Sequence, residues 1–163
     1  MKKIILIMLA SITIYSCSND DANSPSESNS NTKIGEGSYI IDNNTKTTNY
    51  AYWFGGISSE ATFTLTNVKL NSQDDVWNNN SDSVWFDLRP QPNETVNPGT
   101  YRFSINGAYD KYIQDGGHNA DEFVSGIVTI SLDKTIYFVN YDITLKSGKN
   151  IKGNYIGAIN IVK

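Results

Sequence analysis

The side chains most able to do chemistry are scarce in this chain of 163 residues, which holds one Cys, Cys17, and one His, His118. A single Cys excludes an intrachain disulfide framework, a cysteine-based zinc site and an iron–sulfur cluster. A single His excludes any site that needs two imidazoles. His118 follows Asp115-Gly116-Gly117, so we place it in a solvent-exposed loop that is too flexible to hold a general base.

Enzyme signatures are missing from the sequence. It has neither a Gly-x-Ser-x-Gly nucleophile elbow nor a His-Glu-x-x-His metal motif, and no Gly-rich phosphate-binding loop precedes a predicted helix. We therefore predict that the chain is not an enzyme, that it has no catalytic residue and that it takes no cofactor.

Tryptophan side chains are the best candidates for a binding site. Trp85, Asp87 and Arg89 alternate along a predicted strand over Asp82–Arg89 and should share its outward face. An exposed indole offers a flat apolar surface to a sugar ring, and a nearby carboxylate and guanidinium can bond its hydroxyls. Trp77 and Trp53 are further candidates. The alternative is structural, with these indoles lying under loops or at a sheet edge.

Acidic residues gather in or next to a segment that we expect to be a long loop, residues 107–121. They are Asp110, Asp115, Asp121 and Glu122. Calcium is bound by oxygen ligands of the kind that loops supply, but this spacing matches no EF-hand. We predict no metal site, and the sequence leaves open whether this loop binds calcium.

The balance of charge argues against a nucleic-acid partner. Thirteen Lys and Arg stand against 17 Asp and Glu, for a formal charge of −4, and no basic run is present. A protein that binds nucleic acid needs clustered Lys and Arg to displace counterions from phosphates.

The N-terminus reads as a targeting signal. Two lysines precede an apolar run, Ile4–Ile14, which is shorter than the roughly 20 residues of a membrane-spanning helix. The run ends in Ile14-Tyr15-Ser16-Cys17, which resembles a bacterial lipobox. The resemblance implies that residues 1–16 are a lipoprotein signal peptide and that Cys17 is acylated, for instance by palmitate. Two acyl chains suffice for a stable membrane anchor.

The residues after Cys17 suggest a tether and a destination. Residues 17–36 are rich in Ser and Asn with almost no apolar surface, so we expect the lipidated Cys to be followed by a disordered segment. Ser18 resembles the outer-membrane sorting residue of Gram-negative lipoproteins. Asp20 and Asp21 resemble the surface-export signal of Bacteroidetes lipoproteins. These resemblances imply a lipid-anchored, surface-exposed protein of the outer membrane.

Residues 37–163 are predicted to fold as one all-β domain, because apolar residues alternate with a period of two and no helical period persists. The clearest segments are Glu122–Leu132, Thr135–Leu145 and Asn150–Val162, which we predict to form an antiparallel meander. In the last of these, Gly153 and Gly157 should leave room for a large neighbouring ring. About eight strands with one apolar face each favour an antiparallel two-sheet sandwich, with a flattened up-and-down barrel as the alternative.

Two stretches carry a family resemblance. Leu88-Arg89-Pro90 with Pro98–Phe103, and Gly126–Ile130 with Tyr141–Gly157, are similar to small, uncharacterised β-sandwich lipoproteins of the Bacteroidetes surface type. The resemblance implies fold and location and transfers no catalytic residue. We therefore expect a lipid-anchored cell-envelope domain with a binding or structural role and an unassigned protein partner. The alternatives are a surface glycan-binding module and a carrier of a small apolar ligand.

Overall fold

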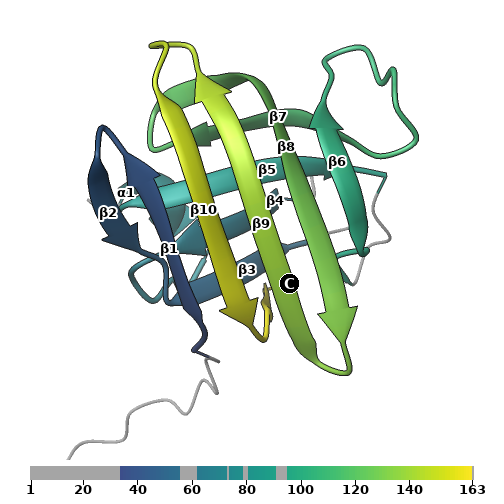
Figure 1. Cartoon of the computed structure of the whole chain (residues 1–163). Helices are drawn as coiled ribbons and strands as arrows, with labels where there is room; N and C mark the ends of the chain where they lie inside the picture. The colour runs from purple at the N-terminus through teal and green to yellow at the C-terminus, as the bar shows by residue number, and fades with distance from the viewer. Residues whose placement is uncertain (1–33, 56–61, 73, 79–80, 91–94, 163) are drawn as a thin grey trace, which may run out of the picture. The chain divides into compact units, whose positions relative to one another are not determined.

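The computed structural model describes residues 34–55, 62–72, 74–78, 81–90 and 95–162, which belong to one compact unit (Figure 1). Cys17 lies outside the described residues. The elements are β1 (Glu36–Ile41), β2 (Asn44–Thr47), β3 (Tyr50–Phe54), β4 (Thr62–Thr66), α1 (Asp74–Asn78), β5 (Ser83–Arg89), β6 (Gly99–Phe103), β7 (Tyr112–His118), β8 (Asp121–Asp133), β9 (Ile136–Leu145), β10 (Asn150–Gly157) and β11 (Asn160–Val162). Since α1 is the one helix in this part of the chain, the predicted all-β class is confirmed.

The strands form a single curled sheet, so the prediction of an antiparallel two-sheet sandwich is wrong. The strand order is β11-β3-β4-β5-β7-β6-β8-β9-β10-β1-β2. In Figure 1, β1, β10, β9, β8 and β6 lie side by side in front, and β3, β4, β5 and β7 cross behind them. The β6–β7 and β11–β3 pairs are parallel. The sheet also departs from an up-and-down barrel, whose neighbouring strands run antiparallel.

Strand β7 joins the front strands to those behind, and the sequence prediction missed it. It pairs with β5 on one side and with both β6 and the start of β8 on the other. We had expected a loop over 107–121 because Asp-Gly-Gly has poor strand propensity. The glycines have a packing role instead: a Cβ on Gly116 would lie 2.4 Å from the ring of Phe123, and one on Gly117 would lie 3.0 Å from the indole nitrogen of Trp85.

The C-terminal meander is confirmed. β8 pairs antiparallel with β9, and β9 with β10. Gly153 also has the predicted role, because it lies opposite Tyr141 and a Cβ there would meet that ring at 2.3 Å. The expected single strand Asn150–Val162 is instead two, since the chain leaves β10 after Gly157 and β11 adds in parallel to β3.

Side chains from the front strands and from the strands behind them meet in one continuous core. The largest fully buried members are Trp53, Tyr39, Tyr101, Tyr155, Phe63 and Phe86. The alternation of apolar and polar residues along a strand agrees with which side chains face the core. In β5, for example, Val84, Phe86 and Leu88 are all buried. Alternation along Glu122–Leu132 would put Val124 on the same face as the buried Val128 and Ile130, but Val124 is exposed. A bulge between Phe123 and Ser125 reverses the faces of β8 at that point.

A second, smaller cluster covers the outer face of β3. Tyr52 and Phe54 point away from the main core and pack against Leu70 and Val76, which belong to the segment that contains α1. The hydroxyl of Tyr52 accepts a hydrogen bond from the backbone N–H of Leu70 at 2.9 Å.

The described residues include no helix with the length and apolar character needed to cross a membrane.

Candidate functional site

The position of His118 differs from the one predicted from the sequence. It ends strand β7, opposite Val84 of β5, and its side chain reaches across the core to β1. There the hydroxyl of Tyr39 lies 2.8 Å from His118 Nε2, and the two rings meet edge to face at 5.3 Å. The interpretation of His118 as a solvent-exposed loop residue is therefore wrong, because the imidazole is half-buried on a strand.

The backbone around His118 is fixed by the tight turn that follows it. Asn119 has a φ of 53° and turns β7 into β8. The carboxamide oxygen of Asn119 accepts a hydrogen bond from Ser83 N at 3.1 Å, and Asn119 N donates to Ser83 O at 3.1 Å. These two bonds attach the turn to β5, so the imidazole is held on a rigid element rather than a loop.

A pocket of about 440 Å³ opens beside the imidazole. Its lining comes from β1, the β7–β8 turn and the β9–β10 hairpin: Ile41, His118, Asn119, Ala120, Asp121, Leu145 and Lys149. Ile41 and Leu145 give it an apolar wall, because both belong to the main core. The remaining lining carries hydrogen-bonding and charged groups. The pocket thus offers an apolar surface and a polar rim to one small molecule, which we call the His118 pocket.

Burial sets the protonation of the Tyr39–His118 pair. It lowers the pKa of His118, although the nearby carboxylates Asp82 and Asp121 act in the opposite direction. Burial also raises the pKa of Tyr39 far above its ordinary value, with a smaller contribution from Asp82. Both groups are therefore neutral at pH 7. Because His118 Nε2 is the partner of the Tyr39 hydroxyl among the described residues, we assign Tyr39 as the donor and the imidazole proton to Nδ1.

Charges of both signs surround the His118 pocket. Lys149 Nζ lies 2.6 Å from a carboxylate oxygen of Asp42, and this hydrogen bond raises the pKa of Lys149. Lys46 pairs with Asp82 at 3.1 Å. Asp121 Oδ1 accepts a hydrogen bond from Ser147 N at 3.3 Å. The rim can therefore present both donors and acceptors to a ligand.

The outward row of β5 has the predicted geometry. Trp85, Asp87 and Arg89 alternate with the buried residues of the strand, and all three are partly exposed. Arg89 Nη2 donates to Asp87 Oδ2 at 3.1 Å, and Arg89 Nε donates to Gln114 Oε1 at 3.0 Å. Arg89 and Asp87 therefore already bond within the protein, while the indole of Trp85 lies over Gly117.

The other tryptophans do not join this row. Trp53 is 0% exposed inside the main core, so its indole is not available to a ligand at the surface. Trp77 belongs to α1, but its side chain lies outside what the structure describes. The structure therefore leaves Trp85 as the one candidate indole that it places on an outward face.

The four acidic residues for which calcium binding was left open are spread out: Asp115 lies in β7, Asp121 and Glu122 lie in β8, and Asp110 precedes β7. Asp115 Oδ1 accepts from Gly116 N at 2.7 Å, and Glu122 lies 3.5 Å from Lys146. In the described part of the chain, no three His, Cys, Asp or Glu side chains gather so that they could hold a metal ion.

Comparison of the chain with family models, with curated proteins and with solved structures found no match.

Proposed function

We propose that this chain is a lipid-anchored domain of the cell envelope that binds a small, uncharged, hydroxyl-bearing ligand of the monosaccharide class in the His118 pocket. One observation carries the proposal: the only imidazole of the chain is fixed by Tyr39 in the wall of a pocket of about 440 Å³. Pockets that bind small molecules have volumes of roughly 300–1,000 Å³ and place a few polar groups against an apolar surface.

The lining supports the ligand class. Ile41 and Leu145 suit the apolar C–H face of a sugar ring. His118 Nδ1 and Lys149 Nζ can donate hydrogen bonds, and the carboxylate of Asp121 can accept them. A hydroxyl both donates and accepts, so it matches this mixed rim. A strongly charged ligand would instead meet groups of its own sign.

A carrier of an apolar ligand is less well supported. Such a carrier needs space inside the curled sheet, whereas the described interior is occupied by large side chains such as Trp53, Phe86 and Tyr101. The proposed site is therefore the pocket at the end of the strands rather than the interior.

The anchoring part of the proposal rests on the sequence. The apolar run before Cys17 and its resemblance to a lipobox support a signal peptide over residues 1–16 and acylation of Cys17. Ser18, Asp20 and Asp21 support the outer surface of the outer membrane as the destination.

Amide NMR titration tests the binding proposal. The ¹⁵N-labelled chain from Cys17 onward is titrated with methyl glycosides of glucose, galactose, mannose and N-acetylglucosamine. At least one should saturably shift the amides of His118, Asp121 and Lys149. Ala120→Phe should abolish these shifts, because Ala120 is an exposed residue of the pocket lining. The matched control Ala108→Phe, at an exposed position of the β6–β7 connection, should retain them.

The same titration separates the His118 pocket from the outward row of β5. Trp85 is the second candidate for a sugar contact, since the structure places it on an outward face as predicted. Trp85→Ala should leave the shifts at His118 unchanged if the ligand lies in the pocket. If binding is lost in Trp85→Ala but survives in Ala120→Phe, the binding site lies on β5 instead. If no glycoside gives a saturable shift, both the pocket site and the β5 site are refuted.

A further inference from the structure

Exposed apolar side chains gather at one end of the front strands. Ile34 is 67% exposed, Ile156 45%, Ile136 39% and Phe138 36%. Ile156 of β10 lies directly opposite both Glu36 of β1 and Phe138 of β9, so all three side chains share the outward face. Ile136 precedes Phe138 by two positions and shares its face. We call Ile34, Ile136, Phe138 and Ile156 the entry patch.

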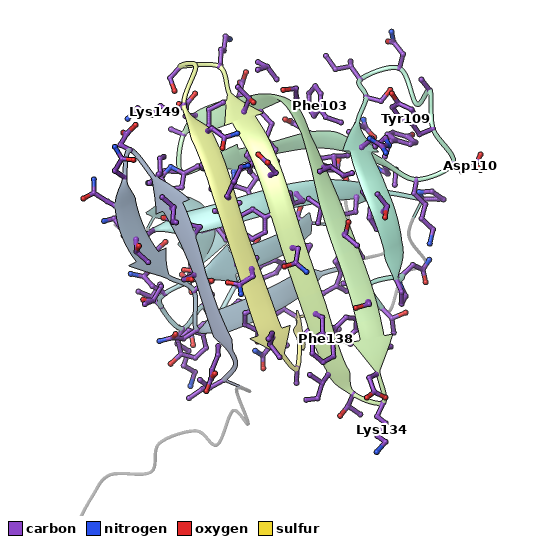
Figure 2. The ribbon with its side chains drawn as sticks, in the orientation of Figure 1. Phe103, Tyr109, Asp110, Lys134, Phe138 and Lys149 are labelled. Carbon is purple, nitrogen blue, oxygen red and sulfur yellow. The ribbon has the colours of Figure 1, made fainter. Side chains whose placement is uncertain are left out.

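The entry patch surrounds the point where the described chain begins. Ile34 is the first described residue, and Gly35 packs against Tyr155, the neighbour of Ile156. The His118 pocket lies at the other end of the same strands: in Figure 2, Lys149 lies at one end of β9 and β10, and Phe138 and Lys134 lie toward the opposite end. The entry patch and the His118 pocket therefore lie at opposite ends of the domain.

We propose that the entry patch rests on the lipid surface to which Cys17 is anchored, so that the His118 pocket faces away from the membrane. This inference rests on the acylation of Cys17 that we proposed above. Cys17 precedes Ile34 by 17 positions. Even a fully extended segment of that length spans at most about 60 Å, so the anchor confines the domain to the membrane surface.

Confinement explains how a small patch can bind lipid. A flexible or short connection raises the effective concentration of a second contact to about the millimolar range, so a weak contact becomes populated. Phe and Ile side chains partition into the boundary between headgroups and acyl chains. The charged residues that flank the patch are few and of both signs: Glu36 and Asp133 are negative and Lys134 is positive. They do not form the block of like charge that would favour an oppositely charged protein. A lipid surface is the partner that the anchor supplies.

Quenching by brominated lipid tests the inference. The chain from Cys17 onward is coupled through its only thiol to maleimide-bearing phosphatidylethanolamine in phosphatidylcholine vesicles. This coupling makes the test independent of natural acylation. Phe138→Trp places an indole in the entry patch, and the matched control Ile40→Trp places one at a 52% exposed outward position near the other end of β1. Wild-type emission, from the native tryptophans, is subtracted.

We expect the added emission of Phe138→Trp to be blue-shifted and quenched by brominated phosphatidylcholine, and that of Ile40→Trp to be unaffected. Equal quenching of the two variants would overturn the inference. The inference would also be overturned if the uncoupled chain self-associated in sedimentation experiments and Phe138→Ser abolished that association. The entry patch would then bind a second copy of the chain. The mass of the natively produced protein reports separately on acylation, so failure of the anchor and failure of the patch are distinguishable.

Discussion

The hydroxyl of Tyr39 lies 2.8 Å from Nε2 of His118, and this contact joins β1 to β7 across the core. The two strands are not neighbours in the sheet. Tyr39 is almost completely buried, so its hydroxyl proton needs an acceptor inside the protein. The neutral imidazole supplies one and leaves its second nitrogen for other contacts at the wall of the pocket.

This pair predicts a pH dependence of stability. Burial lowers the pKa of His118 below its ordinary value of 6.5. Above pH 6.5 the imidazole is neutral in both the folded and the unfolded chain, so its full contribution is present. As the pH falls from 6.5 toward the lowered pKa, the unfolded chain binds the proton first and the folded state loses stability. The urea midpoint should therefore decrease over this interval.

His118→Gln isolates that contribution, because the side-chain oxygen of Gln still accepts from Tyr39 but does not titrate. The variant should lose less stability than the wild type between pH 7.5 and pH 5. The groups that also face the imidazole, Asp82, Asp121, Lys46 and Lys149, are common to both proteins. Identical pH profiles would show that His118 titrates as an exposed imidazole does.

Two buried tyrosines should respond differently to loss of the hydroxyl. The Tyr155 hydroxyl donates to the backbone oxygen of Ala158 at 2.8 Å, so Tyr155→Phe should cost about 0.5–1.5 kcal/mol of unfolding free energy. The hydroxyl of Tyr141 is buried without a hydrogen-bond partner among the described residues. Tyr141→Phe should therefore be neutral or stabilising in urea unfolding. A cost in Tyr141→Phe equal to that in Tyr155→Phe would contradict this packing.

Gly153 should not tolerate a methyl group. A Cβ there would lie 2.3 Å from the ring of Tyr141, which is itself held in the core. We expect Gly153→Ala to destabilise the fold by about 1–3 kcal/mol, the usual cost of overpacking. Tyr141→Leu should make the same substitution less costly, and a double-mutant cycle in urea measures this coupling. Additive effects of the two substitutions would rule out the contact as the cause.

Acylation of Cys17 should be visible in the intact mass of the natively produced protein. The expected product begins at Cys17 and carries acyl chains, and it fractionates with membranes. Cys17→Ala should retain residues 1–16 or lose the lipid, since the motif has no second Cys to replace it. A wild-type protein without acyl mass would contradict the proposed anchor.

Alternation of apolar residues was sufficient to predict the all-β class, the meander and the faces of β5, because those strands bury one side only. It was not sufficient for β7, whose Gly116 and Gly117 have no side chains to alternate and instead receive the rings of Phe123 and Trp85. That missed strand carries His118, so the sandwich prediction and the loop interpretation of His118 failed for the same reason. A signal was available: two adjacent glycines between alternating residues are compatible with a strand crossed by large neighbouring rings.

The most direct test of the His118 pocket is the imidazole itself, because one His gives one set of ring signals. A long-range ¹H–¹⁵N spectrum at pH 7.5 should show the neutral form protonated on Nδ1, because we assign the Tyr39 hydroxyl as the donor to Nε2. Addition of the methyl glycoside that shifts the pocket amides should move the Nδ1 signal in the wild type and leave it unchanged in Ala120→Phe. A ring protonated on Nε2, or a Nδ1 signal that no glycoside moves, would contradict the account.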